Sequence, residues 1–136
     1  MRIAITDDDP QDLRRLSEMT KHGLSSLGYY DNLIDTFHNA EELLAMWTAG
    51  RYDLILLDIY MDGIQGIDAA RKIRKQDEDV RLVFCTSGND FASESYEVHA
   101  HYYMRKPISE DNILRMLERL DLEACEFSRF VTLPDG

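Results

Sequence analysis

The stretch that decides the fold is Asp53-Leu54-Ile55-Leu56-Leu57-Asp58, in which four consecutive apolar residues stand between two carboxylates. Four apolar residues in a row predict a strand that is buried on both sides, because successive side chains of a strand point to opposite faces. Strands of this kind are typical of parallel sheets that are covered by helices on both faces. The stretch therefore predicts the α/β fold class, with one strand that ends on the carboxylate of Asp58.

The rest of the chain repeats the same pattern of a buried strand followed by an amphipathic helix. Short apolar runs predict further strands over residues 2–6, 33–37, 82–85 and 101–104. Helical spacing and capping residues predict helices over residues 11–27, 40–48, 67–76 and 91–98, and a last helix after Ser109. Five such repeats predict a doubly wound, five-stranded parallel sheet with helices on both faces.

The composition is that of a globular domain with an excess of acidic residues. The 136 residues are 44% hydrophobic and 30% charged, which suits a single core without disulfides or a structural metal. Fifteen basic and 26 acidic residues give a formal net charge of −11, which opposes contact of these residues with nucleic acid. The first residues form neither a signal-peptide core nor a membrane span, so we expect a cytoplasmic location and no membrane partner.

Residues that can carry chemistry stand where four of the predicted strands end. The carboxyl ends of parallel strands meet at one edge of the sheet, where ligands bind, so we expect these residues to lie close together. They are Asp7 and Asp8 after the first strand, Asp58 at the end of the third, Thr86 after the fourth and Lys106 after the fifth. The sequence therefore predicts one polar site built from four separate segments.

The carboxylates of this predicted site need a cation, because like charges that share a crevice repel each other. Mg²⁺ prefers oxygen ligands and usually keeps several waters. We therefore predict a Mg²⁺ ion held by Asp7, Asp8 and Asp58, with the backbone carbonyl of Tyr60 as a further ligand.

Such a site favours phosphoryl transfer to Asp58, whose carboxylate can attack phosphorus and form an acyl phosphate. Lys106 supplies a second positive charge, and the Thr86 hydroxyl can bind an oxygen of the phosphate. This chemistry predicts a phosphoacceptor switch and not an enzyme. The reactions expected of the domain itself are at most self-phosphorylation from small donors and self-dephosphorylation. The pair Lys106-Pro107 is in addition a candidate for a cis peptide bond.

Residues 1–122 resemble the receiver domain of the response regulators of bacterial two-component signalling. The resemblance rests on the five-part signature formed by Asp7-Asp8, Asp58, Thr86 and Lys106-Pro107. It implies the strand order 2-1-3-4-5 and a sensor histidine kinase as the phosphate donor.

The same resemblance implies that Tyr103 is the switch residue that turns inward when Thr86 moves toward the phosphate. One position departs from the family pattern. Asp62 stands where the family usually has proline before Gly63, which puts the rigidity of this loop and the lifetime of the phosphate in question.

A finer resemblance concerns the output of the switch. Parts of residues 54–61 and 95–103 resemble regulators whose output is a LytTR-type DNA-binding domain. Residues 123–136 are expected to be a linker and the start of a truncated output domain, so that DNA would be bound only outside this chain. The resemblance also implies a homodimer through the fourth helix, fifth strand and last helix. Charged pairs there would come from Arg105, Arg115, Arg119, Glu94, Glu97 and Glu118.

Two other functions fit part of the pattern. Asp7 and Asp9 stand two apart after a strand, as in Mg²⁺-dependent phosphatases of the haloacid-dehalogenase type, although that family needs a later acidic motif and Asp9 suits a helix cap. A phosphorylation-independent interaction module of the receiver fold usually lacks an acidic residue or the lysine, and this chain retains them. Replacing Asp7 would abolish turnover by a phosphatase, whereas replacing Asp58 would abolish labelling of a receiver.

Overall fold

A single parallel sheet forms the centre of the molecule in the computed structural model, which describes residues 1–87 and 97–123. Its strands are β1 (Arg2–Thr6), β2 (Leu33–Phe37), β3 (Leu54–Asp58), β4 (Arg81–Thr86) and β5 (Tyr102–Arg105). They lie in the order β2-β1-β3-β4-β5, and every neighbouring pair is parallel. The predicted five-stranded sheet and its order are confirmed.

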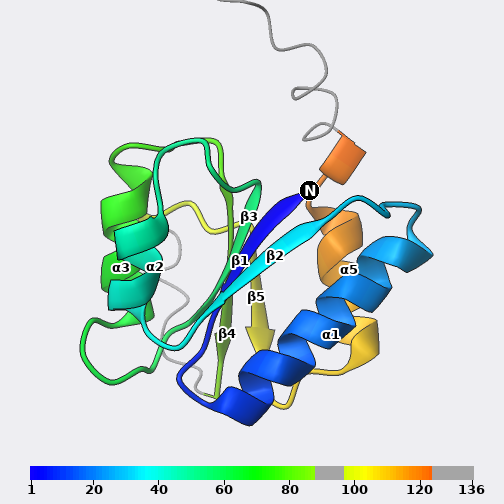
Figure 1. Cartoon of the computed structure of the whole chain (residues 1–136), viewed down its shortest axis with the longest axis horizontal. Helices are drawn as coiled ribbons and strands as arrows, with labels where there is room; N and C mark the ends of the chain where they lie inside the picture. The colour runs from blue at the N-terminus through cyan, green and yellow to red at the C-terminus, as the bar shows by residue number, and fades with distance from the viewer. Residues whose placement is uncertain (88–96, 124–136) are drawn as a thin grey trace, which may run out of the picture.

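Helices cover both faces of this sheet (Figure 1). The described helices are α1 (Pro10–Ser26), α2 (Ala40–Met46), α3 (Gly66–Arg74) and α5 (Glu110–Arg119). Helices α1 and α5 lie side by side on one face, and α2 and α3 lie on the other. The helix expected over residues 91–98 falls largely on residues outside the described ranges. Within those ranges, no helix combines the length and apolar character needed to cross a bilayer.

The starts of the helices follow the capping residues that the sequence predicts. The side chain of Asp9 caps α1, and Pro10 occupies its first turn. Asn39 caps α2, and Ser109 and Asn112 form a reciprocal capping box at the start of α5. The cap on α1 matters for the site, because it fixes the chain direction directly after β1.

The core has two halves, which meet at β3. All five residues of β3 are buried. Leu54 and Leu56 belong to the apolar cluster under α1 and α5, whereas Ile55 and Leu57 belong to the cluster under α2 and α3. The apolar run is thus packed from both sides, as its unbroken sequence predicts, and the strand holds Asp58 on a rigid support.

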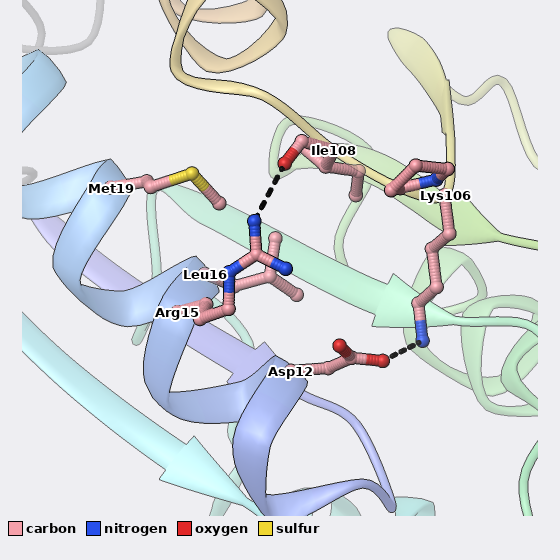
Figure 2. Close-up of a pocket in the computed structure, with 7 residues that line it drawn as sticks. Asp12, Arg15, Leu16, Met19, Lys106 and Ile108 are labelled. Carbon is pink, nitrogen blue, oxygen red and sulfur yellow. Dashed lines mark hydrogen bonds and ion pairs between the residues drawn. The ribbon is translucent and has the colours of Figure 1, made fainter.

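The loop between β5 and α5 lies against α1 (Figure 2). The Lys106–Pro107 peptide bond in this loop is cis. The guanidinium of Arg15 on α1 donates a long hydrogen bond of 3.5 Å to the carbonyl oxygen of Ile108. Lys106 lies at the carboxyl end of the sheet, and its side chain is directed toward α1 and β3.

Candidate functional site

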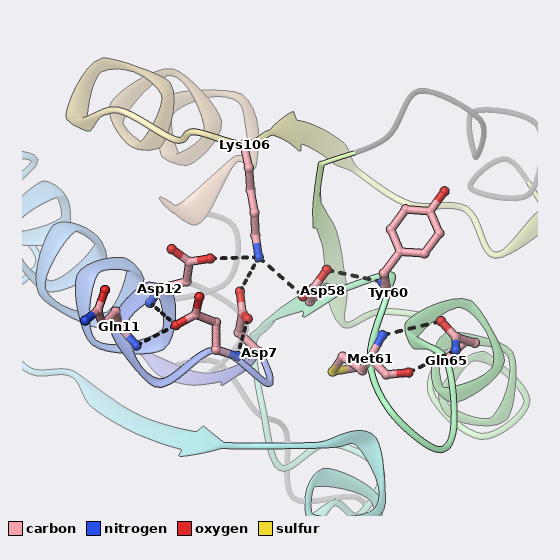
Figure 3. A network of polar contacts seen from close by, with 9 residues as sticks. Asp7, Gln11, Asp12, Asp58, Tyr60, Met61, Gln65 and Lys106 are labelled. Carbon is pink, nitrogen blue, oxygen red and sulfur yellow. Dashed lines mark hydrogen bonds and ion pairs between the residues drawn. The ribbon is translucent and has the colours of Figure 1, made fainter.

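Acidic side chains and one ammonium group meet at the carboxyl ends of β1, β3 and β5 (Figure 3). Lys106 Nζ lies 2.8 Å from Asp7 Oδ2 and 3.3 Å from Asp58 Oδ2. The side chain of Asp7 is 0% exposed and that of Asp58 is 6% exposed, so these ion pairs are shielded from bulk water. Residues that are 48 and 99 positions away from Lys106 in the sequence are therefore brought to one point.

Each of the two buried carboxylates is held in the same way, through one oxygen to the backbone and the other to Lys106. Asp7 Oδ1 accepts a hydrogen bond of 2.9 Å from the N–H of Asp9. Asp58 Oδ1 accepts one of 3.2 Å from the N–H of Tyr60. The backbone thus orients both carboxylates so that their Oδ2 atoms face the Lys106 ammonium.

The electrostatics of the cluster disfavour a second buried negative charge. Burial raises the pKa of Asp58 to about 7, the nearby charge of Asp7 adds to this effect, and Lys106 partly opposes it. Burial lowers the pKa of Lys106, but its hydrogen bond to Asp7 and the charges of Asp58 and Asp7 outweigh that effect and raise the pKa above its usual range. The lysine thus stays charged, and an additional cation would favour the ionised form of Asp58.

A divalent cation has a suitable set of oxygen atoms in this cluster. Asp7, Asp8 and Asp58 each offer one carboxylate oxygen, and these oxygens lie within 4.8 Å of one another. Asp7 and Asp58 are buried, whereas Asp8 is exposed and gives the group an open side toward solvent. An all-oxygen set of this kind fits Mg²⁺, which keeps waters on its open side. The part assigned to the Tyr60 carbonyl stays a prediction.

Thr86 lies on β4, the strand next to β3, and Tyr103 lies on β5, the edge strand beyond β4. Thr86 ends β4 and is fully buried, and its carbonyl oxygen accepts a hydrogen bond of 2.7 Å from the N–H of Lys106. Tyr103 is half-buried and pairs with Phe84 in the β4–β5 ladder. The backbone therefore connects Thr86 directly to Lys106, while the switch roles of Thr86 and Tyr103 stay predictions.

Asp12 is a member of the cluster that the sequence analysis missed. Its Oδ2 lies 3.2 Å from Lys106 Nζ, so the ammonium contacts three carboxylates. The signal available in the sequence was the position of Asp12, three residues after the N-cap Asp9, in the helical turn nearest the site. Acidic residues are common in first turns for reasons of helix stability alone, so that position did not single it out.

The loop after β3 is held by side chains that the sequence analysis also missed. Gln65 Nε2 donates a hydrogen bond of 2.9 Å to the carbonyl oxygen of Met61. The Oε1 atom of Gln65 accepts a hydrogen bond of 3.4 Å from the N–H of Met61. Glu41 of α2 accepts a hydrogen bond of 2.9 Å from the N–H of Ile64, and this hydrogen bond lowers the pKa of Glu41. These contacts join the loop that contains Asp62 to α2 and to the residue before α3.

Asp9 does not have the position that the phosphatase alternative requires. Its Oδ1 accepts hydrogen bonds of 2.9 Å from Gln11 N and 3.4 Å from Asp12 N, so it serves as the cap of α1. The end of β5 supplies Lys106 and not a further acidic residue. The geometry of the described residues therefore favours the receiver over a phosphatase.

Comparison with known proteins agrees with this geometry. A family model described as "Response regulator receiver domain" matches residues 3–118. The positive alginate biosynthesis regulatory protein of Pseudomonas aeruginosa is 29% identical over 119 residues, and the sensory transduction protein LytR of Staphylococcus haemolyticus is 32% identical over 120 residues. Each alignment covers 88% of this chain but only 46% and 45% of those relatives. The chain thus spans about half the length of the curated relatives it matches.

Solved structures show the same fold. The response regulator TrrA from Thermotoga maritima, solved in complex with Mg²⁺-BeF, is 33% identical with a TM-score of 0.69 over 88% of this chain and 97% of that chain. The response regulatory domain of mrkE from Klebsiella pneumoniae has a TM-score of 0.79 at 24% identity over 93% and 99% of the two chains, which shows the fold alone. The chain belongs to the response regulator receiver domain family.

Proposed function

We propose that Asp58 accepts a phosphoryl group from a sensor histidine kinase, and that the phosphorylated domain then controls an output. An Asp58 oxygen attacks the phosphorus, the bond from phosphorus to the donor breaks, and the donor leaves with the electron pair of that bond. The observation that carries this proposal is the Lys106 ammonium, which lies 2.8 Å from Asp7 and 3.3 Å from Asp58. It can stay near the transferred oxygens while negative charge builds up there.

The proposed cofactor is Mg²⁺, held by Asp7, Asp8, Asp58 and the Tyr60 carbonyl. When bound, the ion would offset the negative charge of the carboxylates and of the phosphoryl oxygens. Support comes from the oxygens of Asp7, Asp8 and Asp58, which lie within 4.8 Å of one another, and from TrrA, a relative solved in complex with Mg²⁺-BeF. Further support comes from the backbone N–H groups of Asp9 and Tyr60, which fix one oxygen of Asp7 and of Asp58.

The proposed switch passes from the phosphate to β4 and β5. The Thr86 hydroxyl would bind a phosphoryl oxygen, and Tyr103 would turn inward and alter the face formed by the fourth helix, β5 and α5. The hydrogen bond from Lys106 N to Thr86 O supports such coupling, because it joins the ends of β4 and β5. Homodimerisation through this face is part of the proposal. Glu97, expected in a charged pair there, contacts Arg71 of α3 at 3.1 Å in the described chain.

The proposed output is DNA binding by a LytTR-type domain outside these residues, in the cytoplasm. The similarity to LytR supports this proposal. Residues 1–122 would form the receiver, and residues 123–136 would be a linker and the start of the output domain. The family match ends at residue 118 and α5 ends at Arg119, which is consistent with such a boundary; residues 124–136 lie outside the described ranges.

Binding of fluoroberyllate, an inorganic mimic of the phosphoryl group, tests the proposed site. We expect the wild-type protein to bind it in calorimetry only when Mg²⁺ is present. Asp8→Asn should weaken this binding at least about tenfold, because it removes one charged oxygen ligand, and Asp58→Asn should abolish it.

Asp68→Asn is the matched control for this experiment. Asp68 is an exposed acidic residue on α3 that pairs with Arg71, away from the cluster, so its replacement should leave binding unchanged. Binding that survives in Asp58→Asn, or that needs no Mg²⁺, would contradict the proposed site.

A further inference from the structure

All three N–H donors of the Lys106 ammonium have a carboxylate partner. The partners are Asp7 at 2.8 Å, Asp12 at 3.2 Å and Asp58 at 3.3 Å (Figure 3). A lysine ammonium has three N–H groups and no more. A phosphoryl oxygen on Asp58 can therefore gain a hydrogen bond from Lys106 only if one of these carboxylates releases it.

Asp12 differs from the other two partners in its surroundings. Its side chain is 34% exposed, against 0% for Asp7 and 6% for Asp58. It lies outside the group of three carboxylates whose oxygens can share a metal ion. The backbone holds Asp7 through its second oxygen, and Asp58 is the residue that carries the phosphoryl group. Release into water is thus least costly for Asp12.

The neighbouring cation on α1 does not replace Lys106 as a partner of Asp12. Arg15 lies in the next part of α1, but its guanidinium is directed to the Ile108 carbonyl (Figure 2). Among the described residues, Asp12 forms its ion pair with Lys106. The carboxylate of Asp12 therefore holds one N–H group of the Lys106 ammonium on the side of α1.

We infer that Asp12 is a positioning residue that competes with the phosphoryl group for Lys106 and so restrains phosphorylation of this domain. The inference rests on the proposed function of Asp58. Without the Asp12 charge, one N–H group of Lys106 would be available to the phosphoryl oxygens, and a repulsive charge beside them would be absent. The effect is moderate, because Asp12 is partly exposed and solvent screens its charge.

The test compares Asp12→Asn with Glu18→Gln, which removes the same charge from an exposed position further along α1. We expect Asp12→Asn to tighten Mg²⁺-dependent binding of fluoroberyllate by about threefold to tenfold, and Glu18→Gln to change it by less than about twofold. In the free protein, NMR of the lysine side chains should show a shifted Lys106 ammonium signal in Asp12→Asn and an unshifted one in Glu18→Gln. Thermal unfolding checks that both variants are folded.

Each other outcome overturns the inference. Equal or weaker binding by Asp12→Asn would show that Asp12 does not compete. An equal gain in fluoroberyllate affinity for Glu18→Gln would show that the net charge of the domain causes the effect. A gain in affinity for Asp12→Asn without a shifted Lys106 signal would mean that Asp12 acts without contacting the lysine. If the wild type and both variants fail to bind fluoroberyllate while the Lys106 signal still shifts in Asp12→Asn, the contact is real and the proposed function fails, together with the competition inferred from it.

Discussion

Gly66→Ala should lower the free energy of unfolding by about 3 kcal/mol or more. A Cβ atom on Gly66 would overlap the backbone carbonyl oxygen of Asp58 and would come within 3.0 Å of the Cα atom of Ile59. The backbone of Asp58 and Ile59 cannot move away easily, because β3 is buried at every position. In addition, the N–H of Gly66 donates a hydrogen bond of 3.0 Å to the carbonyl oxygen of Ile59. Urea unfolding followed by circular dichroism measures the loss.

Gly28→Ala separates this steric effect from the conformational cost of replacing a glycine. Gly28 has a φ of +92° and has nothing within 4 Å of the added Cβ, so its replacement should cost only about 1–2 kcal/mol. Alanine is intrinsically the better helix former, so a Gly66→Ala protein as stable as the wild type would contradict the close approach of α3 to the phosphoacceptor strand.

Asp58→Asn should raise the free energy of unfolding at pH 7 by about 1–3 kcal/mol in magnesium-free buffer. The pKa of Asp58 is raised in the folded protein from 3.8 to about 7, first by burial and then by the charge of Asp7. Between these two values the folded state retains a proton that the unfolded state has released. The contribution of Asp58 to stability is therefore fully present below pH 3.8 and is lost as the pH rises toward 7, whereas asparagine contributes no such loss.

Urea unfolding at several pH values between 3.5 and 7.5 measures this effect as the difference between the variant and the wild type, since the other acidic residues are common to both. We expect the difference to grow with pH and to shrink when Mg²⁺ is added, because the ion stabilises only the ionised wild-type site. Parallel stability curves for the two proteins would mean that Asp58 titrates like an ordinary surface carboxylate.

The sequence predicts those parts of the fold in which a single physical rule determines the structure of a segment. The unbroken apolar run of β3 requires burial on both faces, and its side chains alternate between the two halves of the core. Asp9 and Ser109 cap helices where the sequence places them. The rule that parallel strands end at one edge was enough to bring Asp7, Asp58 and Lys106 together.

The parts that the sequence does not predict depend on how far a side chain reaches between elements. The contact of Asp12 with Lys106 joins residues 94 positions apart, and that of Glu41 with Ile64 joins residues 23 positions apart. Neither pair has a periodic signal, because each depends on the packing of a helix against a loop. The end of α2 also differs from the prediction, for a local reason. The helix ends at Met46, where residues up to 48 were expected, because Trp47 turns to extended backbone with a ψ of 139°.

The most direct test of the central claim is the intact mass of the protein after incubation with acetyl phosphate and Mg²⁺. We predict that the wild type gains the mass of one phosphoryl group, that the gain requires Mg²⁺, and that Asp58→Asn shows no gain. A phosphoryl label that persists in Asp58→Asn, or a wild type that stays unlabelled at saturating donor and Mg²⁺, would contradict the assignment of Asp58 as the phosphoacceptor.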